Sequence, residues 1–220
     1  IQENVSPALN AQQTDPLEQG KTALNAGRFA EAETLFQRAW KESSRCEALF
    51  YAGLAGQRAG KVNDAIVAFR SAIECNPSLL SAHLALAETY ADRHDPARAL
   101  ASYEGLLKIA PRHARALRAA AELYLRHQMN DKAVGALGTL VELEPGDVQA
   151  RADLGAAYAA TSQFEKAEAE FRATLRIDPG VPSALTGLAS LRLREDDSNE
   201  AIQLAAKAIE LAPNAYEPRY

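Results

Sequence analysis

The chain has 220 residues, of which 47% are apolar and 24% charged, as in an ordinary folded protein. Its net charge of -5 argues against nucleic acid as a partner, because no basic excess is available to neutralise phosphates. No apolar run approaches the roughly 18 residues of a membrane span, and two cysteines are too few for a disulfide scaffold. Alanine, the best helix former, supplies 46 residues, so we expect an all-α protein without membrane insertion.

The opening stretch is polar, contains Pro7 and lacks a helical period, so residues 1–13 are predicted to be a flexible lead-in. The first residue is Ile1 rather than Met. This indicates either that a leader has been removed or that the sequence is a piece of a longer protein.

A period of 34 residues governs the rest of the chain. It is set by prolines at the same place in five successive units: Pro77, Pro111, Pro145, Pro179 and Pro213. The prolines define units 46–79, 80–113, 114–147, 148–181 and 182–215. A shorter unit, 14–45, precedes them and has Ser44 where the proline belongs. Residues 216–220 are predicted to begin a further, truncated helix.

Each unit is predicted to contain two helices that pack through one apolar face each, at helical spacing. The eighth position holds a small residue, as at Gly20, Gly53 and Gly155, and the twentieth is alanine in all six units. The twenty-fourth is mostly bulky: Phe36, Phe69, Tyr103, Leu137, Phe171 and Ala205. Asp95-Pro96 and Ser162 with Glu165 are predicted to start second helices, and the recurring prolines to end them.

These positions resemble the tetratricopeptide repeat family. Unit 148–181 carries the resemblance best, with Leu154, Gly155, Tyr158, Ala167, Phe171 and Pro179. The resemblance implies a right-handed superhelical solenoid of antiparallel helix pairs, forming a single domain over residues 14–215. The last unit departs from the pattern, with Arg192 where an aromatic residue belongs. We expect its helix pair to leave apolar surface open.

Catalysis needs a nucleophile, base or metal in convergent geometry. No G-x-S-x-G, H-E-x-x-H or paired C-x-x-C motif occurs. We therefore expect no enzyme activity, no cofactor and no metal site.

Cys46 and Cys75 are the first and thirtieth residues of one unit. These two positions lie opposite each other in an antiparallel helix hairpin. They are either a small apolar pair or a disulfide. A disulfide would suit an exported protein, so an exported or periplasmic location is favoured over the cytoplasm.

A second stripe on the first helix of each unit, at positions 2, 5, 9 and 12 with position 13 beside it, is expected to line the concave wall that binds peptides in the proteins that this chain resembles. The stripe is apolar at Phe50, Leu54 and Leu84, with Glu88 beside them, and basic at Arg115, Arg118 and Arg126, with Glu122 between. In the fifth unit it is Ala152, Ala156, Ala159 and Ala160, and in the sixth Ser183, Thr186, Ser190, Leu193 and Arg194.

Two interpretations of the arginines stay open. A partner peptide could place an apolar anchor on Phe50, Leu54 and Leu84 and a carboxylate on the arginines. Alternatively, Glu122 could form an ion-pair ladder with Arg118 and Arg126. The predicted function is a non-enzymatic scaffold that binds a partner protein or peptide. The alternatives are a homo-oligomer assembled through the C-terminal unit and the regulatory arm of a larger enzyme.

Overall fold

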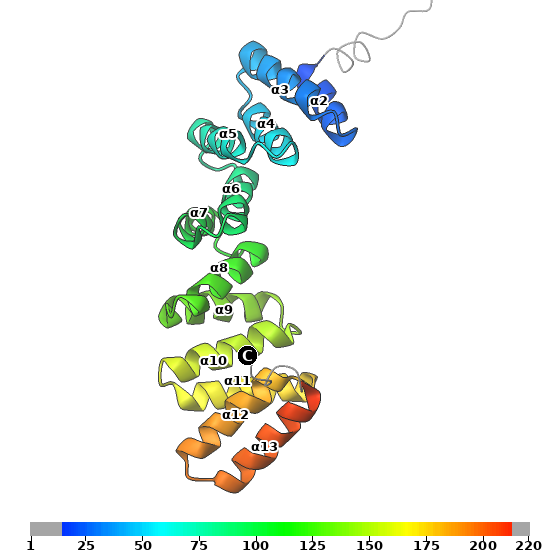
Figure 1. The fold of residues 1–220 in the computed structure, drawn as a ribbon. Helices are drawn as coiled ribbons and strands as arrows, with labels where there is room; N and C mark the ends of the chain where they lie inside the picture. Colours follow the sequence, from blue (N-terminus) through cyan, green and yellow to red (C-terminus); the bar gives the residue numbers. More distant parts are fainter. Residues whose placement is uncertain (1–14, 213–220) are drawn as a thin grey trace, which may run out of the picture. The chain divides into compact units, whose positions relative to one another are not determined.

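The computed structural model of the chain describes residues 15–212, which form helices and turns without any strand. The predicted lead-in at 1–13 and the predicted helix start at 216–220 lie outside this range. The chain divides into two compact units, Ile1–Ala110 and Pro111–Tyr220. The first contains α2 (Pro16–Asn25), α3 (Phe29–Ser43), α4 (Cys46–Arg58), α5 (Val62–Cys75), α6 (Leu80–Asp92) and α7 (Pro96–Ile109) (Figure 1). The second contains α8 (Ala114–Arg126), α9 (Asn130–Leu143), α10 (Val148–Ala160), α11 (Phe164–Ile177), α12 (Pro182–Arg194) and α13 (Ser198–Leu211).

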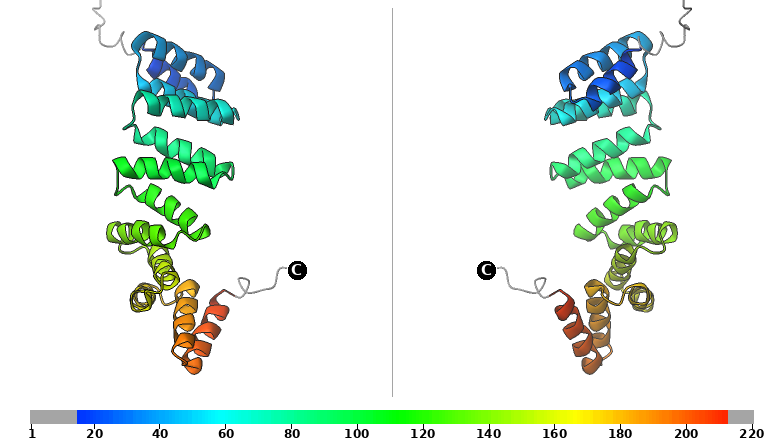
Figure 2. Two further views of the ribbon diagram at one scale, coloured as in Figure 1. Left: turned by 90° about the vertical axis from the view of Figure 1, so that its left-hand side faces the viewer. Right: turned by 90° about the vertical axis from the view of Figure 1, so that its right-hand side faces the viewer.

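Each predicted repeat therefore contains one helix pair, and the repeat boundaries fall between pairs. Within each compact unit every helix packs against the next one, from α2 to α7 and from α8 to α13 (Figure 2). First helices of neighbouring repeats also touch, as α10 and α12 do. The prediction of an all-α repeat solenoid is confirmed, whereas a single solenoid over 14–215 stays a prediction.

The turn inside each pair has one conformation in all six repeats. Its second residue is left-handed, with φ between 56° and 77°, at Gly27, Gly60, His94, Gln128, Ser162 and Asp196. The next amide donates a hydrogen bond to the carbonyl five residues back, as from Gln163 to Tyr158 at 2.9 Å, which closes a Schellman motif. The predicted start of α11 at Ser162 was therefore wrong. Ser162 belongs to the left-handed turn, and the helix begins after Gln163.

Second helices end where the prolines predict. The residue before each of the four recurring prolines within residues 15–212 leaves the helical conformation, with φ between -126° and -135°, because the proline ring disfavours that conformation there. In the first repeat Ser44 replaces the proline and ends α3 in a left-handed conformation instead, with φ 49°. Asp95 caps α7 as predicted, since its side chain accepts a hydrogen bond from the Arg98 amide at 3.2 Å.

Glycine and phenylalanine are matched inside a repeat. A Cβ added to Gly20, Gly53 or Gly155 would lie 2.5, 2.5 or 2.6 Å from the nearest ring atom of the phenylalanine sixteen residues later. Those rings, of Phe36, Phe69 and Phe171, are at most 2% exposed. The repeats with alanine at the eighth position carry Tyr103, Leu137 and Ala205 instead. Close approach of the two helices thus depends on glycine wherever phenylalanine fills the gap.

The Gly155→Ala variant is expected to lower the free energy of unfolding by about 2 kcal/mol, because the new methyl group overpacks against Phe171. The matched control is Gly138→Ala in α9, where an added Cβ meets nothing within 4 Å. That control should gain roughly 0.5–1 kcal/mol from helix propensity. Urea unfolding of both variants measures the difference, and equal stabilisation of the two would contradict the matched packing.

Candidate functional site

The predicted apolar wall lies in the first compact unit. Phe50 and Leu54 are on α4, and Leu84 and Glu88 are on α6, and all four are half-buried. The Phe50 ring packs against the ring of Phe69, with 6.0 Å between centroids. Leu54 packs against the core cluster of α2, α3 and α4. These side chains are therefore partly used in holding the repeats together.

The predicted basic stripe lies on α8 of the second compact unit. Arg118 pairs with both Glu144 and Asp147 in the turn that precedes α10. Arg126 pairs with Glu122 one helical turn back, at 2.5 Å. Arg115 is exposed on the same helix. The predicted ladder forms only between Glu122 and Arg126, while Arg118 is neutralised by the two acidic residues of the turn.

A groove opens between the first helices of the fifth and sixth repeats, with a volume of about 560 Å³. We call it the α10–α12 groove. One wall comes from α10 and the other from α12, and α11 supplies aromatic rings. The lining residues are Ala156, Ala159, Phe164, Phe171, Ser183, Thr186, Gly187, Ser190, Leu191 and Arg194.

Six of these lining residues belong to the predicted stripe of the fifth and sixth repeats. Ala152, predicted in the same stripe, is instead 1% exposed and part of the core. Sequence reasoning missed Gly187, whose hydrogen leaves room for the Phe171 ring. A Cβ at this position would lie 2.3 Å from Cζ of Phe171, so the ring is held against both Gly155 and Gly187. The signal that could have identified Gly187 is its place in the repeat, because none of the other five repeats has glycine at the sixth position.

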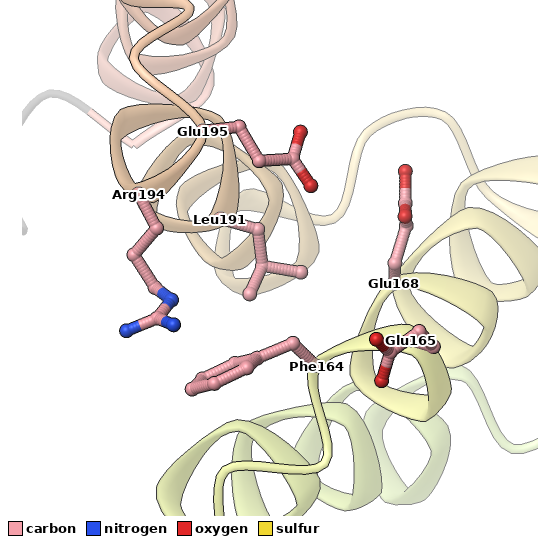
Figure 3. A pocket seen from close by; sticks show the side chains of 6 residues that line it. All are labelled: Phe164, Glu165, Glu168, Leu191, Arg194 and Glu195. Carbon is pink, nitrogen blue, oxygen red and sulfur yellow. The ribbon is translucent and has the colours of Figure 1, made fainter.

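Among the described residues that line the groove, Arg194 is the charged one. Its guanidinium carbon lies 3.6 Å from the centroid of the Phe164 ring (Figure 3). Within residues 15–212 no carboxylate pairs with it. Stacking on an aromatic face leaves the edge of a guanidinium, where its N–H donors point, open to an acceptor.

A smaller pocket of about 170 Å³ shares Phe164, Leu191 and Arg194 with the groove, and three acidic residues complete its lining: Glu165, Glu168 and Glu195 (Figure 3). The buried side chain of Arg192 offsets the negative charge of Glu168 and Glu195. It is 7% exposed and pairs with Glu168, with Glu195 at 2.5 Å and with Glu200 at 2.7 Å. The hydrogen bond with Glu168 is the largest cause that raises the pKa of Arg192.

Arg192 and Glu200 reverse a pair that other repeats share. In the third, fourth and fifth repeats a tyrosine at position 11 lies under a cation at position 19, 5.3–5.6 Å from the ring centroid. These pairs are Tyr90 with Arg98, Tyr124 with Lys132 and Tyr158 with Lys166. The sixth repeat places the cation at position 11 and the acid at position 19.

The family models agree with the repeat geometry. A tetratricopeptide repeat model matches residues 17–79, 84–128 and 118–182, and a second model of that description matches residues 182–215. The chain belongs to the tetratricopeptide repeat (TPR) family. A comparison with curated protein sequences gives no significant match.

Solved TPR structures resemble this chain in fold. YrrB, described as a TPR protein with an unusual peptide-binding site, is 19% identical, with a TM-score of 0.71 over 81% of this chain and 93% of its own. A MamA crystal structure is 21% identical, with a TM-score of 0.66 over 80% of this chain and 97% of its own. MamA from Desulfovibrio magneticus RS-1 is also 21% identical, with a TM-score of 0.64 over 79% and 98%. At these identities the likeness shows the fold alone.

Family and fold together make this TPR protein a scaffold for protein interactions. Among the helices of residues 15–212, none is long and apolar enough to cross a membrane. The same residues contain no group of three or more histidine, cysteine, aspartate or glutamate side chains placed to hold a metal ion.

The pKa values of two carboxylates beside the basic stripe, those of Asp147 and Asp153, are shifted in opposite directions. Burial raises the pKa of Asp153, more than the hydrogen bond from Gln149, at 2.8 Å, lowers it. For Asp147, burial is outweighed by hydrogen bonds from the Ala150 amide and from Arg118, so its pKa is lowered. Ionised Asp147 therefore stabilises the folded state at pH values above the pKa that this group has in the unfolded chain. That stabilisation is lost as the pH falls through the lower pKa of the folded state. Ionised Asp153 costs stability at neutral pH.

The Asp153→Asn variant is expected to raise the free energy of unfolding at pH 7, by at most about 1 kcal/mol for a partly solvated group. Asparagine keeps the acceptor for Gln149 and removes the buried charge. The gain should vanish below the unfolded aspartate pKa of about 4, where Asp153 is protonated in both states. Urea unfolding from pH 3 to 8 measures it, with exposed Glu210→Gln as the control. A gain that persists at pH 3 would contradict the assignment.

Proposed function

We propose that this TPR protein binds a peptide segment of a partner protein in the α10–α12 groove and catalyses no reaction. The observation that carries the proposal is the groove itself. Its volume of about 560 Å³ lies within the roughly 300–1,000 Å³ of ligand-binding clefts. Its lining combines apolar surface with one cation and lacks a nucleophile paired with a base. The likeness to YrrB, a TPR protein with a peptide-binding site, supports the choice of ligand class.

A matched pair of alanine variants tests the proposal. Ala156 lines the groove, whereas Ala169 is exposed on α11 and does not line it. The ligand is selected from a library of random dodecapeptides, each amidated at its C-terminus, with the full chain as bait. We expect Ala156→Trp to weaken binding of the selected peptides by about tenfold or more, because indole fills the groove. Ala169→Trp should bind like the parent protein. Equal binding by both variants, or no peptide selected from either this library or the same library with free C-termini, would overturn the proposal.

The other predicted site residues are secondary contacts in this proposal. Phe50, Leu54, Leu84 and Glu88 are half-buried in the first unit. Arg118 and Arg126 already pair with carboxylates, so a partner's carboxylate would have to displace those partners. We therefore expect the Arg115→Ala/Arg118→Ala variant to change affinity less than Ala156→Trp does.

Self-assembly through the last repeat is a second candidate, favoured by exposed apolar side chains on α13. Ile202 is 66% exposed and Ile209 is 49% exposed, and their spacing of seven residues places them on one helix face. If copies associate there, light scattering should show a mass that rises with concentration. The Ile202→Lys/Ile209→Lys variant should then stay monomeric, and a monomeric parent protein would exclude this candidate.

We also propose an oxidising compartment, such as the periplasm or the cell exterior. The proposal is supported by the pairing of Cys46 with Cys75, because disulfides persist mainly outside the reducing cytosol. Thiol titration of the unfolded, unreduced protein tests it. We expect no reactive thiol, and two reactive thiols in protein taken from its native source would overturn it.

A further inference from the structure

We infer that the α10–α12 groove selects a peptide segment with an apolar side chain and, a few residues away, an acidic side chain whose carboxylate binds Arg194. The inference rests on the proposed function and adds the chemistry of the partner. It names an internal aspartate or glutamate as the source of the carboxylate. It depends on three observations: the residues that line the groove, the contacts of Arg194, and the length of α12 along the groove.

Arg194 is available for such a ligand. Of the described residues that line the groove, it alone is charged. Its guanidinium is stacked on Phe164 at 3.6 Å, and no carboxylate of residues 15–212 pairs with it. The stack fixes the plane of the guanidinium and leaves its edge donors for a carboxylate, which they can bind in a bidentate manner.

The neighbouring acidic residues do not take this role. Figure 3 places the carboxylates of Glu165 and Glu168 on the other side of Leu191 from the Arg194 guanidinium. Glu168 and Glu195 both pair with Arg192, which offsets their charge. A carboxylate brought by a ligand therefore meets a cation that forms no ion pair with the described residues 15–212.

The rest of the groove fits apolar side chains. Ala156, Ala159 and Gly187 have little or no side chain, and Phe171 lies against Gly187. Ser190 donates its hydroxyl hydrogen to the Thr186 carbonyl at 3.0 Å, so this hydroxyl is engaged within α12. The floor near Gly187 therefore takes an apolar group, while Arg194 supplies the charged contact.

The spacing along α12 sets the spacing in the ligand. Gly187 and Arg194 are seven residues apart, which is about 10 Å of helix at 1.5 Å per residue. An extended peptide covers that distance in about three residues. The expected motif is an apolar residue and an acidic residue about two to four positions apart. The groove continues along α12 back to Ser183, which suits an internal segment rather than a chain end.

Charge reversal tests the inference. The peptides selected against the full chain should be enriched in the apolar-acidic motif although their C-termini are amidated. Arg194→Glu should weaken them by about tenfold or more, because it replaces a charge-assisted pair with repulsion. Replacing the acidic residue of the peptide by lysine should restore binding to Arg194→Glu. The control is Arg176→Glu, which changes an exposed arginine of α11 outside the groove and should bind like the parent protein.

Other outcomes would overturn the inference and separate it from the proposed function. Selected peptides without an acidic residue, or equal binding to Arg194→Glu, would refute the carboxylate contact. If Ala156→Trp still blocks those peptides, the groove stands as a peptide site. Binding only of peptides with a free C-terminus would assign Arg194 to a chain end. A change in oligomeric state on Arg194→Glu, measured by light scattering without peptide, would make a second copy the occupant. Circular dichroism verifies that each variant folds.

Discussion

Replacing Arg192 by leucine is expected to lower the free energy of unfolding by about 3 kcal/mol, the cost typical of breaking a buried ion pair. Arg192 is 7% exposed and joins Glu168 on α11, Glu195 after α12 and Glu200 on α13. Its removal leaves three carboxylates that repel one another at the packing contacts of the last repeat. Urea unfolding, followed by circular dichroism, measures the loss.

Two further variants define the origin of this effect. Arg172 also pairs with Glu168, at 2.8 Å, but is 58% exposed, so Arg172→Leu should cost no more than about 0.5 kcal/mol. The Arg192→Tyr/Glu200→Lys variant installs the tyrosine–cation pair of three other repeats and should recover part of the lost stability. If Arg192→Leu costs no more than Arg172→Leu, the buried network does not stabilise the last repeat.

Removing the disulfide by Cys46→Ser/Cys75→Ser is expected to lower the free energy of unfolding by about 3.6 kcal/mol, the chain-entropy value for a loop of this size. The bridge joins the first residue of α4 to the last residue of α5, with a Cα–Cα distance of 5.6 Å and a sequence separation of 29. It closes the open end of a helix hairpin whose other end is a tight turn.

Reduction provides the control for this variant. A thiol reductant should destabilise the parent protein by the same amount and leave the serine variant unchanged. A parent protein insensitive to reduction would mean that the hairpin gains nothing from the bridge. Both measurements use the two-state midpoint in urea, with the slope compared to detect a change in the denatured state.

The helices of this protein could be predicted because their determinants are local and repeated. Four described prolines at one phase follow the ends of second helices, and the glycines that approach Phe36, Phe69 and Phe171 identify the packed faces. The turn was harder. The left-handed conformation could be predicted from residue type only at Gly27 and Gly60. Four other residues adopt it in the remaining repeats: His94, Gln128, Ser162 and Asp196. The repeat imposes this conformation on residues that do not favour it alone.

The candidate site could be predicted as a stripe but not as a groove. Helical spacing, together with the stacking of repeats that the family resemblance implies, placed Ala156, Ala159 and Arg194 on one surface. The partners of each arginine depend on side-chain directions that spacing does not give. Arg118 turns to Glu144 and Asp147 in the turn before α10, whereas Arg194 stacks on Phe164 and stays without a carboxylate among residues 15–212.

The central claim is that a partner peptide binds between α10 and α12. Hydrogen exchange of the full chain, with and without a selected peptide, tests it most directly. Bound peptide should slow exchange of α12 amides within residues 183–194 and of α10 amides around 156–159, and leave α4 and α6 unchanged. Protection confined to α4, α6 or α8, with none at α12, would contradict this claim.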